Sequence, residues 1–391
     1  MKDLVVGSLL FLAIVIGWFL GKAERKKKPA HLGADPITRE YFLGLNLLLD
    51  DKQDEAMEVF MRTLDVNPDT VDTYLVMGSL FRRRGEVDRA IRIHQDLLAR
   101  PTLSKLQQNT VRFELARDYL KAGLLDRAER ILKELVTEDS VYVVRCLELL
   151  LSIYEQEKSW DEAVETGNVL IGKGKAEIQP RLAHYYCEMA EKSHKLGDIV
   201  DARRHLKKAL QVDKNSVRAS LLQGRFEFDA GEYSDAIKSL RRVRHQDNDF
   251  SPETLGLLEK SYEALNEPRE YIKYLFTLLE QHPAISIVIA LSEKLRQLEG
   301  DYEGAYVLSE YLKKRPSVRG LHRLIDFHLA NTEGPAKENL ALLQAFTQQM
   351  IHNKPIYQCK ACGFDGKALH WHCPSCLGWG TVKPIHGLEG E

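Results

Sequence analysis

Four cysteines near the C-terminal end have the type and spacing of a metal site. They form two Cys-x-x-Cys pairs, Cys359 with Cys362 and Cys373 with Cys376, separated by ten residues. Each pair places two thiolates on one tight turn, and two such turns supply the four sulfurs of a tetrahedral site. Gly363 follows the first pair and can adopt the positive φ that such a turn requires. The spacing therefore predicts one tetrahedral metal ion held by these four cysteines.

Two disulfides or four unrelated thiols are the alternatives to a metal site. The other two of the 6 cysteines, Cys146 and Cys187, each stand alone in an apolar helical pattern, which is typical of a small buried side chain. A module of 39 residues over 353–391 is too small to fold on apolar burial alone, so the metal would supply on the order of 10 kcal/mol of folding free energy. Four thiols kept for a metal also indicate a reducing compartment.

No other motif in the sequence has the spacing of a catalytic site. There is no nucleophile elbow, no glycine-rich phosphate loop and no HExxH helix. His370 and His372 flank Trp371 beside the second cysteine pair, but four sulfurs already complete a tetrahedron, so we expect supporting or surface roles for them. We therefore predict that the protein is not an enzyme.

The distribution of charge argues against nucleic acid as a partner. With +3 on residues 1–36 and +1 on residues 353–391, the net charge of −2 leaves −6 for the residues between them. Binding to phosphates would need a concentrated positive face instead. Basic runs at 82–84, 203–208 and 241–244 lie near the ends of predicted helices, where cations favour the helix dipole and water, so we expect solvated surface there.

The N-terminus predicts a membrane anchor over residues 1–21, followed by a basic juxtamembrane linker over residues 22–36. Residues 4–21 are uncharged, and as a helix they extend about 27 Å, close to the thickness of a hydrocarbon core. A cleaved signal peptide would carry its positive charge before the apolar stretch, whereas here five basic residues follow it. A buried core helix would lack this basic cluster. The positive-inside rule places the bulk of the chain in the cytoplasm.

Residues 37–352 repeat with a period of about 34 residues, which predicts an all-α array of about eight to nine helical hairpins. Each unit reads as a helix, a turn and a second helix. A small residue recurs in the first helix, at Gly44, Gly78, Ala116, Ala190 and Gly224. An alanine recurs in the second helix, at Ala56, Ala90, Ala128, Ala163, Ala202, Ala236 and Ala305, and glycine recurs in the turn, at Gly85, Gly123, Gly197, Gly231 and Gly300.

These repeat positions predict packing rather than chemistry. One alanine is missing at Tyr271, so we expect that unit to pack more loosely or with a shifted turn. A partner-binding surface is expected on the concave face of the repeats over 37–352, which the first helices line. Gly17 and Gly21 form a GxxxG in the anchor, which leaves a homodimer possible.

The order of these parts resembles the lipopolysaccharide assembly protein B family of Gram-negative bacteria. That order is an N-terminal anchor, a tetratricopeptide array and a terminal four-cysteine module, and it covers essentially the whole chain. The most specific segments are RGEVDRAIRIHQ at 84–95, CKACGF at 359–364, WHCPSC at 371–376 and KPIHGLEG at 383–390.

The resemblance implies a rubredoxin-like module whose Cys359, Cys362, Cys373 and Cys376 bind iron, with zinc as the alternative. It also implies a single-pass protein of the inner membrane that restrains lipopolysaccharide synthesis. In that family, the protein promotes degradation by the FtsH protease of the deacetylase LpxC, which commits precursors to lipid A, and is thought to link synthesis to export. An electron-transfer protein and a general tetratricopeptide assembly chaperone are the alternative functions.

The cysteine module carries more large apolar side chains than so small a unit can bury by itself. Phe364, Trp371 and Trp379 are the examples, and only residues 352–356 join the module to the last repeat. We therefore predict that the module docks on the repeat array as a structural clasp.

Overall fold

A computed structural model describes residues 71–352, 354–388 and 390, together with single residues and short runs between 18 and 59. The predicted anchor over 1–21, apart from Trp18, and the linker over 22–36 lie outside these residues. Within the described part, no helix has both the length and the hydropathy needed to cross a bilayer. The chain divides into two compact units, Met1–Cys146 and Leu147–Glu391, called unit 1 and unit 2 below.

Unit 1 contains two complete helix pairs in its described residues. They are α4 (Val71–Arg84) with α5 (Val87–Leu98) and α6 (Lys105–Lys121) with α7 (Leu125–Thr137). Apolar side chains of α4 and α5 form one core cluster that includes Met77, Phe81 and Leu97.

Arg82 in the first basic run was expected to face water, and this expectation is wrong. Arg82 is 8% exposed, and its guanidinium contacts the Asp118 carboxylate at 2.6 Å, because that acid lies buried on the neighbouring helix.

Helix α8 (Val143–Glu157) contains the boundary between the units, and the other helices belong to unit 2. The remaining pairs are α10 (Gln179–Lys195) with α11 (Ile199–Val212), α12 (Val217–Asp229) with α13 (Tyr233–Gln246), α14 (Leu255–Ala264) with α15 (Pro268–Gln281), α16 (Ile285–Glu299) with α17 (Asp301–Lys314), and α18 (Val318–Ala330) with α19 (Pro335–His352). Helix α9 (Trp160–Gly172) follows α8 along the chain and packs against α10, and two short 3₁₀ helices, η1 (Ala176–Ile178) and η2 (Asn248–Thr254), precede α10 and α14. The helix pairs confirm the predicted all-α repeat array.

The turn glycines have the backbone conformation that their position requires. Gly85, Gly123, Gly197, Gly231 and Gly300 all have positive φ, between 75° and 112°. Glycine adopts this conformation without the steric cost that a side chain brings. In two units without a turn glycine, Lys158 and Asn266 take the same left-handed conformation, with φ of 57° and 58°.

The alanines of the second helices are buried as predicted from Ala56 to Ala236. At the last predicted alanine, Ala305, the buried position is shifted by one residue. In α17 the buried residue is Gly304, whereas Ala305 is half-buried. A side chain at Gly304 would come within 2.6 Å of the Ser292 carbonyl oxygen of α16, so the backbones approach too closely there for alanine. Tyr271 does not loosen its unit, since it is fully buried and its hydroxyl donates to the Leu255 carbonyl at 3.2 Å.

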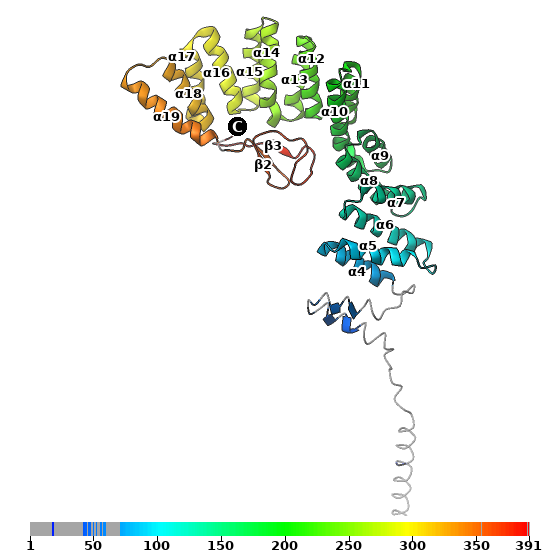
Figure 1. Cartoon of the computed structure of the whole chain (residues 1–391). Helices are drawn as coiled ribbons and strands as arrows, with labels where there is room; N and C mark the ends of the chain where they lie inside the picture. Colours follow the sequence, from blue (N-terminus) through cyan, green and yellow to red (C-terminus); the bar gives the residue numbers. More distant parts are fainter. Residues whose placement is uncertain are drawn as a thin grey trace, which may run out of the picture. The chain divides into compact units, whose positions relative to one another are not determined.

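The C-terminal module is a small antiparallel sheet with the order β2-β1-β3. Its strands are β1 (Tyr357–Cys359), β2 (Asp365–Gly366) and β3 (Val382–Pro384). Tyr357 pairs with Gly366 on one side and with Pro384 on the other. The module lies on the inner side of the arc that the helix pairs of unit 2 describe (Figure 1).

Candidate metal centre

The first cysteine turn begins where strand β1 ends. The N–H of Cys359 donates to the Phe364 carbonyl at 2.7 Å, and the N–H of Gly363 donates back to the Cys359 carbonyl at 2.9 Å. Gly363 has a φ of 79°, as its position in the sequence predicted. These two bonds close the turn and direct the sulfurs of Cys359 and Cys362 toward one point.

The second cysteine turn repeats this geometry with a different residue at the critical position. The N–H of Cys373 donates to the Gly378 carbonyl at 2.9 Å, and the N–H of Leu377 donates to the Cys373 carbonyl at 3.0 Å. Leu377 occupies the place of Gly363 and has a φ of 58°. A left-handed leucine costs on the order of 1–2 kcal/mol, so the rest of the site must hold this turn in place.

The four sulfurs have the spacing of a tetrahedral metal site. The sulfur of Cys359 lies 3.7 Å from that of Cys376, and the sulfur of Cys362 lies 3.7 Å from that of Cys373. All four lie within 4.8 Å of one another. A metal–sulfur distance of about 2.3 Å gives a tetrahedron with edges of about 3.8 Å. The donor set therefore fits one ion such as zinc or iron, and both metals accept four thiolates.

The thiols of the cluster differ in how readily they lose their protons. The hydrogen bond with the Thr381 hydroxyl, helped by backbone N–H groups, lowers the pKa of Cys359 to about 6. At Cys376 the N–H of Gly378 lowers the pKa, but desolvation and the three neighbouring thiols outweigh it and raise the pKa to about 11. Four thiolates at this separation repel one another unless a metal ion neutralises them.

Four protein sulfurs leave no open coordination position in a tetrahedron. A catalytic zinc site keeps one position for water or substrate, whereas a structural site closes all four. When bound, the metal would supply a rigid cross-link between two turns rather than a reactive centre. Cys359 and Cys373 are buried and Cys362 and Cys376 are exposed, so the site lies at one edge of the module.

Trp379 fixes the module to α8 and α10 of unit 2. Its indole N–H donates to the Glu155 carboxylate at 2.6 Å, and the Tyr185 hydroxyl donates to the same oxygen at 2.5 Å. The Arg181 guanidinium also donates to Glu155, which balances the charge of this acid. The Trp379 ring packs edge-on against Trp160 and Tyr185, with centroids 6.2 Å and 5.9 Å away.

A second aromatic contact surrounds His184 of α10. Its ring stacks on Trp379 with centroids 5.1 Å apart and lies 5.9 Å from Trp371. Trp371 in turn stacks on Phe250 of η2 at 5.3 Å. These contacts confirm the predicted docking of the module on the repeat array within unit 2.

Polar contacts continue along strand β3 and the C-terminal residues. The Lys383 ammonium donates to Asp247 at 2.8 Å and to Asp249 at 3.2 Å. These contacts lower the pKa of Asp249 although desolvation alone would raise it. At α18, the N–H of Val318 donates to the Leu388 carbonyl at 2.9 Å.

The histidines beside the cysteines take supporting positions, as predicted. The His372 ring stacks on Trp379 at 4.4 Å, and the His370 ring meets Phe364 edge-on at 6.1 Å. Among the described residues, the clustered metal-binding group contains only the four cysteines.

The sequence did not indicate Glu155 and His184, the two residues of unit 2 that bind Trp379 of the module by a hydrogen bond and by ring stacking. The surplus of tryptophan in the module indicated that a docking surface exists. Nothing in the sequence indicated which repeats provide it, because Trp379 and Glu155 are 224 residues apart.

Comparisons with known proteins agree with this architecture. Residues 357–384 match the family described as rubredoxin metal binding domain, and residues 73–106, 113–177 and 194–260 match tetratricopeptide repeat families. The chain is similar to lipopolysaccharide assembly protein B of Escherichia coli strain K12, with 37% identity over 98% of each chain. It is 33% identical to the protein of that name from Haemophilus influenzae, over 97% of this chain and 98% of the relative. A tetratricopeptide repeat protein from Parabacteroides merdae aligns with 72% of this chain and 99% of its own, at 13% identity and a TM-score of 0.34.

Proposed function

We propose, since this chain belongs to the lipopolysaccharide assembly protein B family, that it is a non-enzymatic scaffold acting in lipopolysaccharide assembly. The observation that carries the proposal is the closed four-cysteine module packed against an array of helical repeats. Repeat arrays of this kind bind other proteins through the surfaces that their helices expose. A closed metal site gives such a scaffold rigidity and no reaction centre.

The finer proposal is an adaptor of the cytoplasmic face of the inner membrane. Residues 1–21 would anchor the chain, residues 22–36 would lie along the membrane surface, residues 37–352 would bind partners, and residues 353–391 would hold iron or zinc. The partners would be the FtsH protease and its substrate, the deacetylase LpxC. Holding both proteins at one place raises their effective concentration, which promotes degradation without any new chemistry.

The test is to separate the anchor from the folded part. Deletion of residues 1–21 should leave a soluble, folded protein that no longer lowers the cellular amount of LpxC, measured by immunoblot. The control replaces residues 1–21 with an unrelated apolar span of equal length and orientation, which should restore regulation. Unchanged regulation by the truncated protein would refute the anchored adaptor.

Electron transfer is a second candidate, because Cys362 and Cys376 are exposed and would give an electron a short path from a bound iron to a partner. This function requires a reversible one-electron couple in the purified protein. Zinc as the metal isolated with the native protein, or a redox-inert iron site, excludes it.

A further inference from the structure

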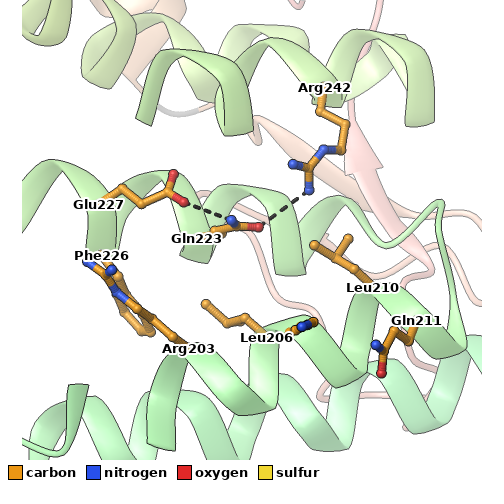
Figure 2. Close-up of a pocket in the computed structure, with 9 residues that line it drawn as sticks. Arg203, Leu206, Leu210, Gln211, Gln223, Phe226, Glu227 and Arg242 are labelled. Carbon is orange, nitrogen blue, oxygen red and sulfur yellow. Dashed lines mark hydrogen bonds between the residues drawn. The ribbon is translucent and has the colours of Figure 1, made fainter. Parts of the chain in front are cut away.

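A groove runs between α11 and α13, with α12 as its floor (Figure 2). Its volume is about 470 Å³, which is in the range of ligand-binding clefts. Both bordering helices are second helices of their pairs. The metal module packs mainly on α8, α10 and η2, and it also touches second helices, through Trp379 on Trp160 of α9 and through Leu369 and Trp371 on the cluster that includes Val243 of α13. Its lining includes Arg203, Leu206, Lys207, Leu210, Phe226, Glu227 and Arg242.

The groove gathers three cations of two basic runs, and two of them form no ion pair within the described part of the chain. Arg203 at its edge contacts Glu232 at 2.6 Å. Lys207 and Arg242 form no ion pair with any residue in the described part of the chain; Arg242 makes only a 3.4 Å hydrogen bond to the Gln223 side chain.

Other members of the same basic runs contact aromatic rings instead. Arg241 and Arg244 lie over Tyr274, at 4.9 Å and 5.7 Å from its ring centroid, and Lys208 lies 5.7 Å from Tyr186. The cations of these helices thus divide into those that stabilise the fold and those that line the groove. Within the described part of the chain, Lys207 and Arg242 thus place two positive charges without an ion-pair partner in the groove, which also contains the Glu227 carboxylate.

The floor offers both an apolar surface and a hydrogen-bond acceptor. Leu206 and Phe226 are only 1% and 4% exposed and lie beneath the groove, whereas the half-buried Leu210 presents apolar surface to it. Figure 2 shows the Gln223 side chain between Glu227 and Arg242, donating to the Glu227 carboxylate at 2.7 Å. The other oxygen of Glu227 has no hydrogen-bond donor among the described residues, although this residue is only 9% exposed.

We propose that this groove binds an acidic peptide segment of a partner protein, with one apolar side chain of the peptide against Leu210. The acidic side chains of the peptide would pair with Lys207 and Arg242. Its backbone N–H groups would donate hydrogen bonds to Glu227, whereas a fully ionised phosphate has no donor for this carboxylate. A lipid surface fits less well, because the apolar residues are recessed and a carboxylate lies among them. The proposal deepens the scaffold function, on which it rests, by naming the chemistry of one client contact.

The experiment uses the full-length protein in neutral detergent and measures fluorescence anisotropy of a labelled peptide. The probe carries aspartates around one phenylalanine, and a matched probe carries asparagines instead. The acidic probe should bind more tightly than the neutral one, and its affinity should fall with added salt, as screening predicts. The double variant Lys207→Glu, Arg242→Glu should weaken binding about tenfold.

Two controls make the result specific to the groove. The variant Lys260→Glu, Lys337→Glu carries the same change in net charge on exposed residues outside the groove, and it should bind like the wild type. Equal binding of both probes, or equal weakening by both double variants, would overturn the proposal. Displacement of the probe by short-chain phosphatidylglycerol, at concentrations at which neutral phosphatidylcholine has no effect, would also overturn the proposal. These binding outcomes leave the anchored adaptor untouched, since deletion of residues 1–21 tests it separately.

Discussion

Acidification should weaken the attachment of the metal module because His184 must stay neutral at its docking site. His184 is 8% exposed and lies between Trp371 and Trp379. Burial lowers its pKa from 6.5 to about 3, and the positive charge of Arg218 and the neighbouring His372 add to this effect. Its Nδ1 has no hydrogen-bond partner among the described residues, so nothing there would stabilise a proton.

The sign and size of the effect follow from the two pKa values. Between pH 6.5 and pH 3 the unfolded chain binds a proton at this histidine and the folded chain does not. The free energy of unfolding therefore falls as the pH drops below 6.5. At pH 5 the loss from His184 alone is about 2 kcal/mol relative to neutral pH.

The assay compares denaturant unfolding of the metal-loaded wild type and the His184→Phe variant at pH 7 and pH 5. Tryptophan fluorescence reports the transition, since Trp371 and Trp379 flank the substituted ring. Phenylalanine keeps the aromatic packing and cannot be protonated. Any cost at pH 7 cancels in the comparison of the two pH values, and protonation of the cysteines affects both proteins alike.

The wild type should lose about 2 kcal/mol more than His184→Phe between pH 7 and pH 5. The matched control is His328→Gln, because His328 is exposed and its substitution should leave the pH dependence of the wild type unchanged. If His184→Phe shows the same pH dependence as the wild type, then His184 is not the group that couples docking to pH.

Three further predictions concern the module and the array. Removal of the metal by a chelator should raise hydrogen exchange in the repeats of unit 2 as well as in the module, and exchange confined to the module would contradict the clasp. Trp379→Phe keeps a ring but loses the N–H that Glu155 accepts, which should cost about 1.5–3 kcal/mol in chemical denaturation; an unchanged midpoint would show that the hydrogen bond adds nothing. Gly304→Ala should cost about 1–3 kcal/mol by thermal unfolding because its methyl group meets the Ser292 carbonyl oxygen. Gly256→Ala is the matched control, since a side chain there meets nothing within 4 Å, and an equal loss in both variants would refute the close approach.

The local parts of this architecture could be predicted because their causes lie close together in sequence. Two Cys-x-x-Cys turns need only their own backbone bonds to direct their sulfurs, so spacing alone indicated the site. The turn glycines were predictable for the same reason, since a positive φ is a property of one residue. Leu377 is the exception, because its left-handed conformation depends on the completed site.

The packing partners could be predicted only in part, since one position can be filled in several ways. At Tyr271 the repeat pattern called for alanine and suggested loose packing, yet the ring fills the space and bonds to Leu255. At Ala305 the pattern was one residue out of register, because only the contact between α16 and α17 makes Gly304 the buried position. The repeats that the module contacts could not be predicted. The sequence shows that the module has more apolar side chains than it can bury, but it does not show which helices lie beside the module in the folded protein.

Docking of the module divides the surfaces of unit 2 into two kinds. The module covers part of the side formed by α8, α10 and η2, so a partner that binds this side of unit 2 would have to touch the module or displace it. That contact should change when the metal is lost. The groove between α11 and α13 is lined by residues other than the cluster of Val217, Val243 and Phe250 on which Leu369 and Trp371 of the module pack, so a peptide there should tolerate an undocked module. Measuring both interactions with Cys359→Ser, Cys362→Ser would therefore separate a client held through the metal module from one held by the repeats alone.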